Sequence, residues 1–443
     1  MRAAGEEPGA RGGAERTHPF VSLAWGMEHR SLASAAARLF AFARAFARRA
    51  ARCRRGPMSR LLLGSIVASL SMMLGCDAPP EPDRAARRTT EARPGPTEFS
   101  VPPSTSAEAS ASAPAPAPRP PVRVALDEKA MGTHVSIAAY TSDTLDEPAL
   151  RQKLGKAIAE IRRLEGLMTT WRDDSEISRI NAGAGKSAAT VSAETLAVIE
   201  KSVWMSERSE GVFDITFEAM HGLWKFDQDL EERIPDRGKV LAARRLIDWR
   251  KIKIDHAART VMLDKPGMRM SLGGIAKGYA VDAAARVLTE EGLTAFFVQA
   301  GGDLFVRGRK PDGSPFRVGV RDPRGRDAND WFAMLEVVDH AFSTAGDYER
   351  GFIKDGKRYH HIIDPRTGFP ATACRSVTIW AKDAFTADAV DDAVFILGPE
   401  KGLALVDALE DAGAVIVDAR NKVWVSAKLK DRLHILRPPA DGT

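Results

Sequence analysis

The hydrophobic pattern of residues 122–171 repeats first at strand spacing and then at helical spacing. Residues 122–140 predict a strand, a turn at Met131–Thr133 and a second strand, because apolar and polar positions alternate on both sides of the turn. Residues 149–171 predict a helix. The apolar face of this helix consists of Leu154, Ile158, Ile161, Leu164 and Met168.

Further along the chain, helices and strands alternate without a regular order. Residues 192–211 predict a helix that Ser192 caps, with Glu194 near it, and that Gly211 closes. Strand patterns occur at residues 295–300, 316–321, 332–338 and 375–381, and residues 414–426 predict a hairpin. This order favours an α+β fold, with mixed and antiparallel sheets flanked by helices, over a regular doubly wound fold. There is no internal repeat.

Composition separates the first 121 residues from this globular region. Twelve of the 26 prolines lie between Pro79 and Pro121, and a segment of that composition cannot bury a core. We therefore interpret residues 77–121 as a tether and residues 122–443 as the globular domain, which is long enough to bury a large core.

Residues 58–76 have the layout of an export signal: a short positive start, an apolar run and a small residue before Cys76. The run is shorter than the ~20 residues that span a bilayer. The final Met-Leu-Gly-Cys resembles a bacterial lipobox, which makes Cys76 the predicted lipidation site; an ordinary cleaved signal with an incidental cysteine is the alternative. Met58 is then the initiator, and residues 1–57 are a mis-assigned extension or a disordered segment. We expect a lipid anchor in the bacterial cell envelope, on the periplasmic face of the inner membrane, which Asp77 favours.

The basic composition of the chain comes from its first residues. Residues 1–57 contain eleven arginines and four glutamates, so their formal charge is +7. The whole chain has a formal charge of +5, and residues 58–443 therefore carry −2. The body of the protein therefore gives no support to nucleic-acid binding. The globular region, residues 122–443, contains a single cysteine, Cys374, which allows no internal disulfide and is expected to be a small buried residue.

Glycine-rich turns provide the first candidate chemistry. Residues 271–288 predict a glycine turn that leads into a helix, where backbone N–H groups and Lys277 suit an anion; a tight structural turn is the alternative. The paired glycines before Asp303 allow a ligand or a neighbouring strand to approach the main chain. A similar strand end carries Asp347 and Tyr348.

Two neighbouring histidines, His360 and His361, precede a strong turn signal at residues 364–368. A histidine at a strand end can act as a general base near neutral pH. Since adjacent strand side chains point to opposite faces, at most one of the two can face a given site. A structural or solvent-facing pair is the alternative.

Three aspartates lie close together in the predicted helix around residues 386–397. Asp388 and Asp392 are one helical turn apart and Asp391 is their neighbour, so their charges repel one another unless a cation intervenes. Oxygen ligands of this kind suit Mg²⁺ or Ca²⁺, and the helix offers no histidine or cysteine for zinc. The alternative is a helix start, where carboxylates favour the positive end of the helix dipole.

Eight ordered blocks give the chain a resemblance to the ApbE family, the FAD:protein FMN transferases, from Met131 to the C-terminal hairpin. The blocks are MGTHVSI, SEISRIN, GVFDIT with a following LW.F, LGGIAKGYAVD, GGDLFVRG, STAGDYER, HHIIDPRTGFP and ADAVDDAVFILG. The resemblance implies an ApbE-like (T-fold-like) single catalytic unit and a reaction in which FAD, bound with Mg²⁺ or another divalent cation, gives its FMN half to a Thr or Ser hydroxyl of a target protein and AMP leaves. It also implies a target among the subunits of membrane redox complexes, such as the sodium-pumping NADH:quinone reductase or the Rnf type.

The resemblance implies roles for particular residues. His361 is expected to be the base, and Asp303 to orient the site. The metal is expected to be held by Gly274 (through its main-chain carbonyl), Asp388, Asp391 and Asp392. Contacts to FAD are expected from Met131, Val212, Phe213, Asp214, Ser271, Lys277 and Ile362.

The chain departs from the family pattern at three of its positions: Asp392 stands where many members have Thr, Ser271 replaces a frequent Asp, and Ala345 replaces a frequent Ser. These departures bear on metal preference and efficiency more than on the class of reaction. The alternative function is a lipoprotein that binds FAD for storage or as an accessory, or that hydrolyses it to FMN and AMP, without transfer to a protein.

Overall fold

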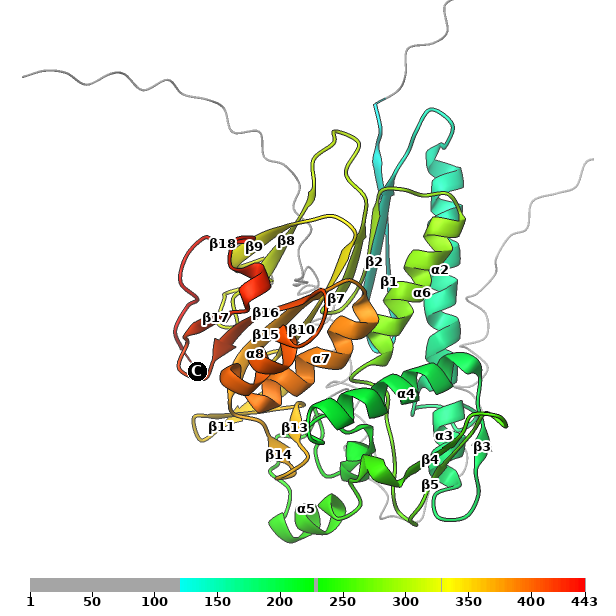
Figure 1. Ribbon diagram of the computed structural model, residues 1–443, viewed down its shortest axis with the longest axis vertical. Coiled ribbons are helices and arrows are strands. Elements are labelled where there is room, and N and C mark those ends of the chain that lie inside the picture. Colours follow the sequence, from blue (N-terminus) through cyan, green and yellow to red (C-terminus); the bar gives the residue numbers. More distant parts are fainter. Residues whose placement is uncertain (1–119, 227–229, 328, 443) are drawn as a thin grey trace, which may run out of the picture. The chain divides into compact units, whose positions relative to one another are not determined.

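An eight-stranded antiparallel sheet forms the centre of the computed structural model (Figure 1), which describes residues 120–226, 230–327 and 329–442. The strand order is β1-β2-β6-β7-β10-β15-β16-β17. Their bounds are β1 Arg123–Ala130, β2 Thr133–Tyr140, β6 Phe296–Ala300, β7 Asp303–Arg307, β10 His340–Gly346, β15 Cys374–Ala381, β16 Ala412–Asp418 and β17 Val423–Val425. The predicted extension, signal segment, lipidation site Cys76 and nearly all of the tether lie outside the described residues. No described helix has the length and apolar character needed to cross a bilayer.

Side-chain alternation gives the sheet two buried faces. In β6, Phe296 and Val298 belong to the core beneath the helices, whereas Phe297 between them belongs to a second core on the opposite face. The first face is covered by helices α2 (Glu147–Met168), α6 (Ala276–Glu290), α7 (Ala384–Leu397) and α8 (Pro399–Asp407). The second is covered by a three-stranded sheet of β18 (Leu433–Ile435), β9 (Trp331–Val337) and β8 (Phe316–Arg321).

Most of the remaining elements lie below α2, α6 and α7 in Figure 1. They are α3 (Glu176–Ala182), α4 (Ala193–Arg208), α5 (Arg237–Arg244), the short 3-10 helices η1 (Ile215–Met220) and η2 (Trp249–Lys251), and a small sheet of β3 (Ala189–Thr190), β5 (Thr260–Leu263) and β4 (Ile252–Asp255). Two hairpins follow β10 in the chain, β11 (Gly351–Lys354) with β12 (Lys357–His360) and β13 (Ile363–Asp364) with β14 (Phe369–Pro370). A last 3-10 helix, η3, spans Ala427–Leu429.

Helices α6 and α7 cap one another, and this contact positions the candidate site. Asp282 of α6 accepts hydrogen bonds from the backbone N–H groups of Ala384 (2.9 Å) and Phe385 (2.8 Å) at the start of α7. In return, Asp388 of α7 accepts one from the backbone of Gly278 (2.7 Å) near the start of α6. A Cβ at Gly278 would lie only 2.3 Å from the carbonyl oxygen of Ala384, so glycine permits this close approach.

The described elements confirm the predicted α+β fold class. The hairpin at residues 122–140, the helices at 149–171 and 192–211, and the hairpin at 414–426 all occur where the hydrophobic pattern placed them. Ser192 accepts from the backbone of Thr195 as the predicted N-cap, and Gly211 follows the helix with a positive φ of 81°. All pairings between the described strands are antiparallel.

Candidate functional site

Lys277 lies among carboxylates that come from two separate elements. Its Nζ is 3.2 Å from Oδ2 of Asp303 at the start of β7 and 3.1 Å from Oδ1 of Asp388 on α7. Asp303 and Asp388 are 1% and 2% exposed, whereas the Lys277 side chain keeps 20% exposure. Burial alone would lower the pKa of Lys277, but the charges of Asp303, Asp388 and Asp391 outweigh that effect and raise it. Lys277 is therefore a permanent cation at this position.

The three aspartates predicted to bind metal lie in the interior of α7. The helix begins at Ala384, and its N-cap is Asp383, whose side chain accepts from Thr386 N. Asp388, Asp391 and Asp392 lie beyond the first turn, where the favourable effect of the helix dipole on carboxylates has fallen off. The helix-start interpretation of these three residues is therefore wrong, because Asp383 and Asp282 provide the caps.

Ser343 of β10 connects two of the buried carboxylates. Its Oγ is 2.7 Å from Oδ1 of Asp303 and 2.6 Å from Oδ2 of Asp391. A hydroxyl group has one proton to donate, so it can serve only one ionised carboxylate at a time. The second short contact requires a proton on Asp303 or Asp391. The cluster therefore holds at least one carboxyl proton when no other cation is present.

The pKa values of these carboxyl groups agree with that requirement. Burial, and next the charge of Asp388, raise the pKa of Asp303 to about 7. Burial, together with Asp392, Asp388 and Asp303, raises the pKa of Asp391 well above its ordinary value. Burial raises the pKa of Asp392 to about 6. Four acidic groups share one ammonium group, and this excess of negative charge is not a source of stability.

The donor set fits a hard divalent cation. The carboxylates offer only oxygen, and Gly274 of the glycine turn lies against Asp392, because a Cβ at Gly274 would be 3.1 Å from Asp392 Oδ2. Oδ2 of Asp303 is buried without a hydrogen-bond partner, although Lys277 contacts it as a charge. Among the described residues, no three His, Cys, Asp or Glu side chains converge as a ready metal cage. Mg²⁺ commonly takes one or two carboxylates and completes its shell with water and phosphate, so the predicted metal ligands stay a prediction.

The two histidines have different environments, as the strand geometry predicted. His360 is 3% exposed, contacts the carbonyl oxygen of Ala371 through Nε2 (2.9 Å), and packs edge-on against Phe395. His361 is half-buried, with Nδ1 3.4 Å from the carbonyl oxygen of Arg350. Burial, and then the charges of Arg350 and His360, hold the pKa of His361 well below its ordinary value. His361 is therefore neutral at pH 7 and able to accept a proton, whereas His360 is a core residue.

The residues predicted to contact FAD occupy several segments around the cluster. Met131 and Gly132 both have positive φ (52° and 67°) at the β1–β2 turn, which is unusual for a methionine. Phe213 lies near the glycine turn, since a Cβ at Gly274 would be 3.8 Å from its ring. Val212 and Ile362 are buried in the main core. Ser271 is half-buried, and its hydroxyl accepts from Gly273 N at 3.3 Å.

Asp214 already has structural partners for both of its carboxylate oxygens. Oδ1 accepts from the backbone (2.8 Å) and the hydroxyl (2.6 Å) of Thr216, and Oδ2 accepts from Trp249 N (2.9 Å). These bonds start η1 and attach it to the η2 region. These side-chain bonds give no support to a contact of Asp214 with FAD, which stays a prediction.

The glycine and turn motifs are mostly structural. A Cβ at Gly301 would lie 2.7 Å from Thr133 Oγ1, and one at Gly302 would lie 2.7 Å from the carbonyl oxygen of Thr344, so neighbouring strands occupy the space beside them. Asp347 forms a two-contact ion pair with Arg324 (2.7 and 2.8 Å). The start of α6, which was predicted to suit an anion, is occupied by the carboxyl group of Asp388 from the same protein.

Sequence reasoning missed two residues of the site. Ser343 is the first residue of the STAGDYER block but was given no role, and only its place in the strand that pairs with β7 brings it to Asp303. Arg350 lies within electrostatic reach of both His361 and Asp392, because its charge lowers the pKa of each. It is the last residue of the STAGDYER block, in which the sequence singled out Asp347 and Tyr348 instead.

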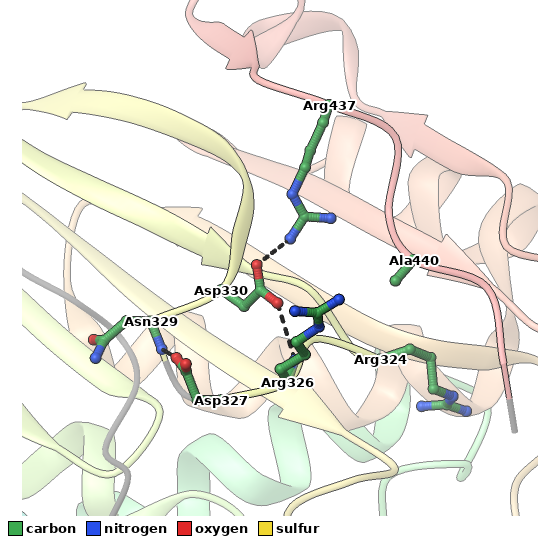
Figure 2. A pocket seen from close by; sticks show the side chains of 7 residues that line it. All are labelled: Arg324, Arg326, Asp327, Asn329, Asp330, Arg437 and Ala440. Carbon is green, nitrogen blue, oxygen red and sulfur yellow. Dashed lines mark hydrogen bonds and ion pairs between the residues drawn. The ribbon is translucent and has the colours of Figure 1, made fainter.

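A cavity of about 580 Å³ lies elsewhere, near the C-terminal segment, and Figure 2 shows its side chains. Two of the three arginines that line it are in ion pairs: Arg437 contacts Asp322 and Asp330, and Arg324 contacts Asp347. None of the predicted site residues lines it. We therefore place the candidate site at the four carboxyl groups around Lys277, which we call the acidic cluster: Asp303, Asp388, Asp391 and Asp392.

The sequence of this chain is similar to those of known flavin transferases. The model of the ApbE family matches residues 131–416. A FAD:protein FMN transferase of Treponema pallidum is 32% identical over 70% of this chain and 88% of that protein, and one of Vibrio cholerae is 31% identical over 70% and 92%.

Solved structures agree with these relatives. The ApbE protein of Thermotoga maritima has a TM-score of 0.63 and 32% identity, over 70% of this chain and 99% of that chain. The flavin transferase ApbE of Vibrio cholerae has a TM-score of 0.63 and 29% identity, over 71% and 100%. These likenesses confirm the predicted fold class.

Proposed function

Because the chain belongs to the ApbE family, we propose that it is an FAD:protein FMN transferase. The reaction moves FMN from FAD to a Thr or Ser hydroxyl of an exported or membrane redox protein and releases AMP. The observation that carries the proposal is the group of buried carboxylates around Lys277, next to the glycine turn at Gly274. Buried carboxylates that repel one another would destabilise the fold if their role were only structural. They are suited instead to a divalent cation, which can bind a diphosphate in turn.

Asp388, Asp391, Asp392 and the carbonyl of Gly274 would hold the cation. Mg²⁺ bound there would neutralise charge on the FAD diphosphate and so favour displacement at phosphorus. Lys277 keeps Asp303 and Asp388 in place by its two ion pairs. The hydroxyl of Ser343 contacts both Asp303 and Asp391, and so keeps these two carboxyl groups close together.

His361 is the proposed base. Its neutral imidazole takes the proton of the acceptor hydroxyl while the hydroxyl oxygen bonds to the phosphorus of the FMN half. The bond from that phosphorus to the bridging oxygen of the diphosphate breaks, and AMP leaves with the oxygen. The products are the phosphoester on the target protein and AMP. Arg350 stabilises the neutral form of His361 electrostatically.

We also propose that Cys76 carries a lipid anchor that holds the domain at the periplasmic face of the inner membrane. This proposal rests on the sequence of residues 58–76. Mass spectrometry of the protein from membranes tests it, because a diacylated or triacylated Cys76 at the mature N-terminus is expected. An N-terminus without lipid would contradict it.

The activity is tested by incubating the full-length chain with FAD, Mg²⁺ and a candidate acceptor protein. Flavin fluorescence of the acceptor in a denaturing gel, a mass gain equal to the FMN group and release of AMP are the expected results. AMP release without labelling of any acceptor would favour FAD hydrolysis. Tight FAD binding without either product would favour the storage or accessory function.

A further inference from the structure

A second cavity, of about 430 Å³, lies between α5 and the turn of the β13–β14 hairpin. We call it the arginine pocket. The residues that line it are Arg237, Leu241, Arg244, Arg366, Thr367 and Phe369. Three of the six are arginines and none is acidic, so the pocket has a positive lining.

The positive charge of this pocket is largely uncompensated. Arg366 is paired with Asp364 through Nε (2.9 Å) and Nη2 (2.8 Å). In contrast, Arg237 and Arg244 form no ion pair with any carboxylate in the part of the chain that the structure describes. Arg244 donates instead to the carbonyl oxygen of Arg366, which fixes its guanidinium against the hairpin. Two arginines thus remain for an external anion.

The pocket also has an apolar part. Leu241 is 40% exposed, which makes it one of the few large apolar side chains with that exposure in the described residues. Phe369 is half-buried and meets Trp224 edge-on, with ring centroids 5.6 Å apart. Carboxylate-binding arginines beside an exposed leucine and a fixed aromatic ring match a peptide with an acidic and an apolar side chain. A free inorganic anion would use only the arginines.

The pocket is built from the far ends of two segments that lead to the candidate site. A Cβ at Gly368 would lie 2.5 Å from Val240 of α5 and 2.8 Å from Met220, the last residue of η1, so these three elements are packed together. The η1 helix begins beside Phe213, and the hairpin follows directly on His361. Arg366 lies five positions after His361 in the chain, which limits the distance between their Cα atoms to roughly 18 Å. A short extended peptide can therefore reach from the pocket to His361.

We propose that the arginine pocket binds an acidic segment of the acceptor polypeptide, with a carboxylate at Arg237 and Arg244 and an apolar side chain against Leu241 and Phe369. The proposal rests on the proposed transferase function and specifies the chemistry of its protein substrate. The pocket holds the acceptor a few residues away from the hydroxyl group that reacts at His361. It contributes to acceptor affinity and leaves FAD binding unchanged.

A matched pair of variants tests the pocket. Arg237→Glu with Arg244→Glu reverses two charges in the pocket, whereas Lys239→Glu with Arg245→Glu reverses two charges on or next to the same helix outside it. The probe is a short fluorescein-labelled peptide with one threonine, two glutamates and one leucine, and its twin has glutamines in place of the glutamates. Anisotropy at low ionic strength measures binding to the full-length chain, since added salt screens exposed charges.

We expect the glutamate peptide to bind the wild type about tenfold more tightly than its twin, and the pocket variant to lose that difference while the control variant retains most of it. If both variants lost this preference for the glutamate peptide equally, the preference would come from the overall positive charge of this surface and not from the pocket, and the proposal would be overturned. Binding of anionic phospholipid vesicles without binding of the peptide would assign the pocket to a lipid surface and also overturn it.

The kinetic form of the test separates this proposal from the proposed function. With any acceptor that the wild type labels, the pocket variant should raise the acceptor KM about tenfold. Its dissociation constant for FAD and its kcat at saturating acceptor should not change. An unchanged acceptor KM would overturn the pocket proposal alone, whereas failure of the wild type to label any acceptor would count against the transferase.

Discussion

Asp391 shows how a single residue of the acidic cluster is held in an unfavourable environment. Its Oδ2 contacts Ser343 Oγ at 2.6 Å and its Oδ1 accepts from Asp392 N at 2.5 Å, while nearby carboxylates raise its pKa well above the ordinary value. An asparagine of the same shape would keep the bond from Asp392 N. Its amide would donate to Ser343 Oγ, and the serine proton would be free for Asp303.

Asp391→Asn is therefore predicted to stabilise the metal-free protein by about 1–2 kcal/mol, because it removes a carboxyl group that is costly to ionise at this buried position and completes the hydrogen bonds. Thermal unfolding with a chelator present should show a rise of a few degrees. The same variant should lose the rise in melting temperature that Mg²⁺ gives the wild type. A variant that is less stable without metal would mean that the carboxylate has a structural role.

The two histidines provide a paired prediction on chemistry and stability. His361→Ala should lower the rate of FMN transfer by ~10²–10⁴-fold, because the base is lost, and leave FAD affinity and melting temperature nearly unchanged. His360→Ala should instead cost roughly 2–4 kcal/mol of stability, because it empties a buried position and leaves the carbonyl oxygen of Ala371 without its partner. Retained transfer in the His361 variant would assign the base elsewhere.

At the scale of elements, the contact between α6 and α7 depends on Gly278. A Cβ there would lie 2.3 Å from the Ala384 oxygen and 2.7 Å from Asp388 Cβ, so Gly278→Ala should force the helices apart and cost roughly 1–3 kcal/mol. Gly155→Ala in α2 is the control, since its Cβ would meet nothing within 4 Å, and it should stabilise by ~0.5–1 kcal/mol. Chemical denaturation of both variants measures the contrast. Equal effects would show that α6 and α7 can separate without cost.

Asp282, which caps α7, predicts a pH dependence of this same contact. Burial raises its pKa to about 7 in the folded protein, compared with an ordinary value of 3.8. A raised carboxyl pKa means that the folded state binds the proton more tightly, so the contribution of the group to stability is full below pH ~4 and is lost as the pH rises toward 7. Asp282→Asn has no such titration. The difference in unfolding free energy between wild type and variant should therefore decrease from pH ~4 to ~7, and a constant difference would contradict the assignment.

The sequence predicted the elements better than it predicted their contacts. Periodicity located α2 and α4 because each has an apolar stripe, and the charge pattern located Asp388, Asp391 and Asp392 on one helix. Local pattern could not reveal that Asp388 caps α6 or that Asp282 caps α7, because those bonds join residues about a hundred positions apart. The helix-start interpretation was wrong because α7 begins before these aspartates: Asp383 is its local N-cap, and Asp282 on another helix accepts from the N–H groups of its first turn.

Ser343 illustrates the limit for single residues. Ser343 begins the STAGDYER block, but the sequence does not show which side chains it contacts, and its role appears only when β10 pairs with β7 and faces α7. His360 and His361 were an easier case, since strand alternation required that only one of them could face the site, and the structure buries the other. Sequence therefore named the acidic and basic groups, and tertiary pairing supplied the neutral residue between them.

At the scale of the whole molecule, the candidate site exists only in the folded chain. Lys277, Asp303, Ser343 and Asp388 come from four elements that are separated by long stretches of sequence. The unfolded chain has no such site, so ligands that bind there should stabilise the folded state by mass action, by ~2.7 kcal/mol at a concentration of 100 times the dissociation constant.

Mg²⁺ and FAD are further predicted to stabilise the molecule together by more than the sum of their separate effects. If the cation neutralises the diphosphate, each ligand must raise the affinity of the other by the same factor, with a coupling of about 1–3 kcal/mol. Thermal unfolding of the full-length chain with chelator, with Mg²⁺, with FAD and with both ligands measures this excess. Asp391→Asn should abolish this excess stabilisation, while the stabilisation by FAD without Mg²⁺ should stay unchanged. Strictly additive stabilisation in the wild type would mean that the two ligands bind at independent sites, and the acidic cluster would then need another explanation.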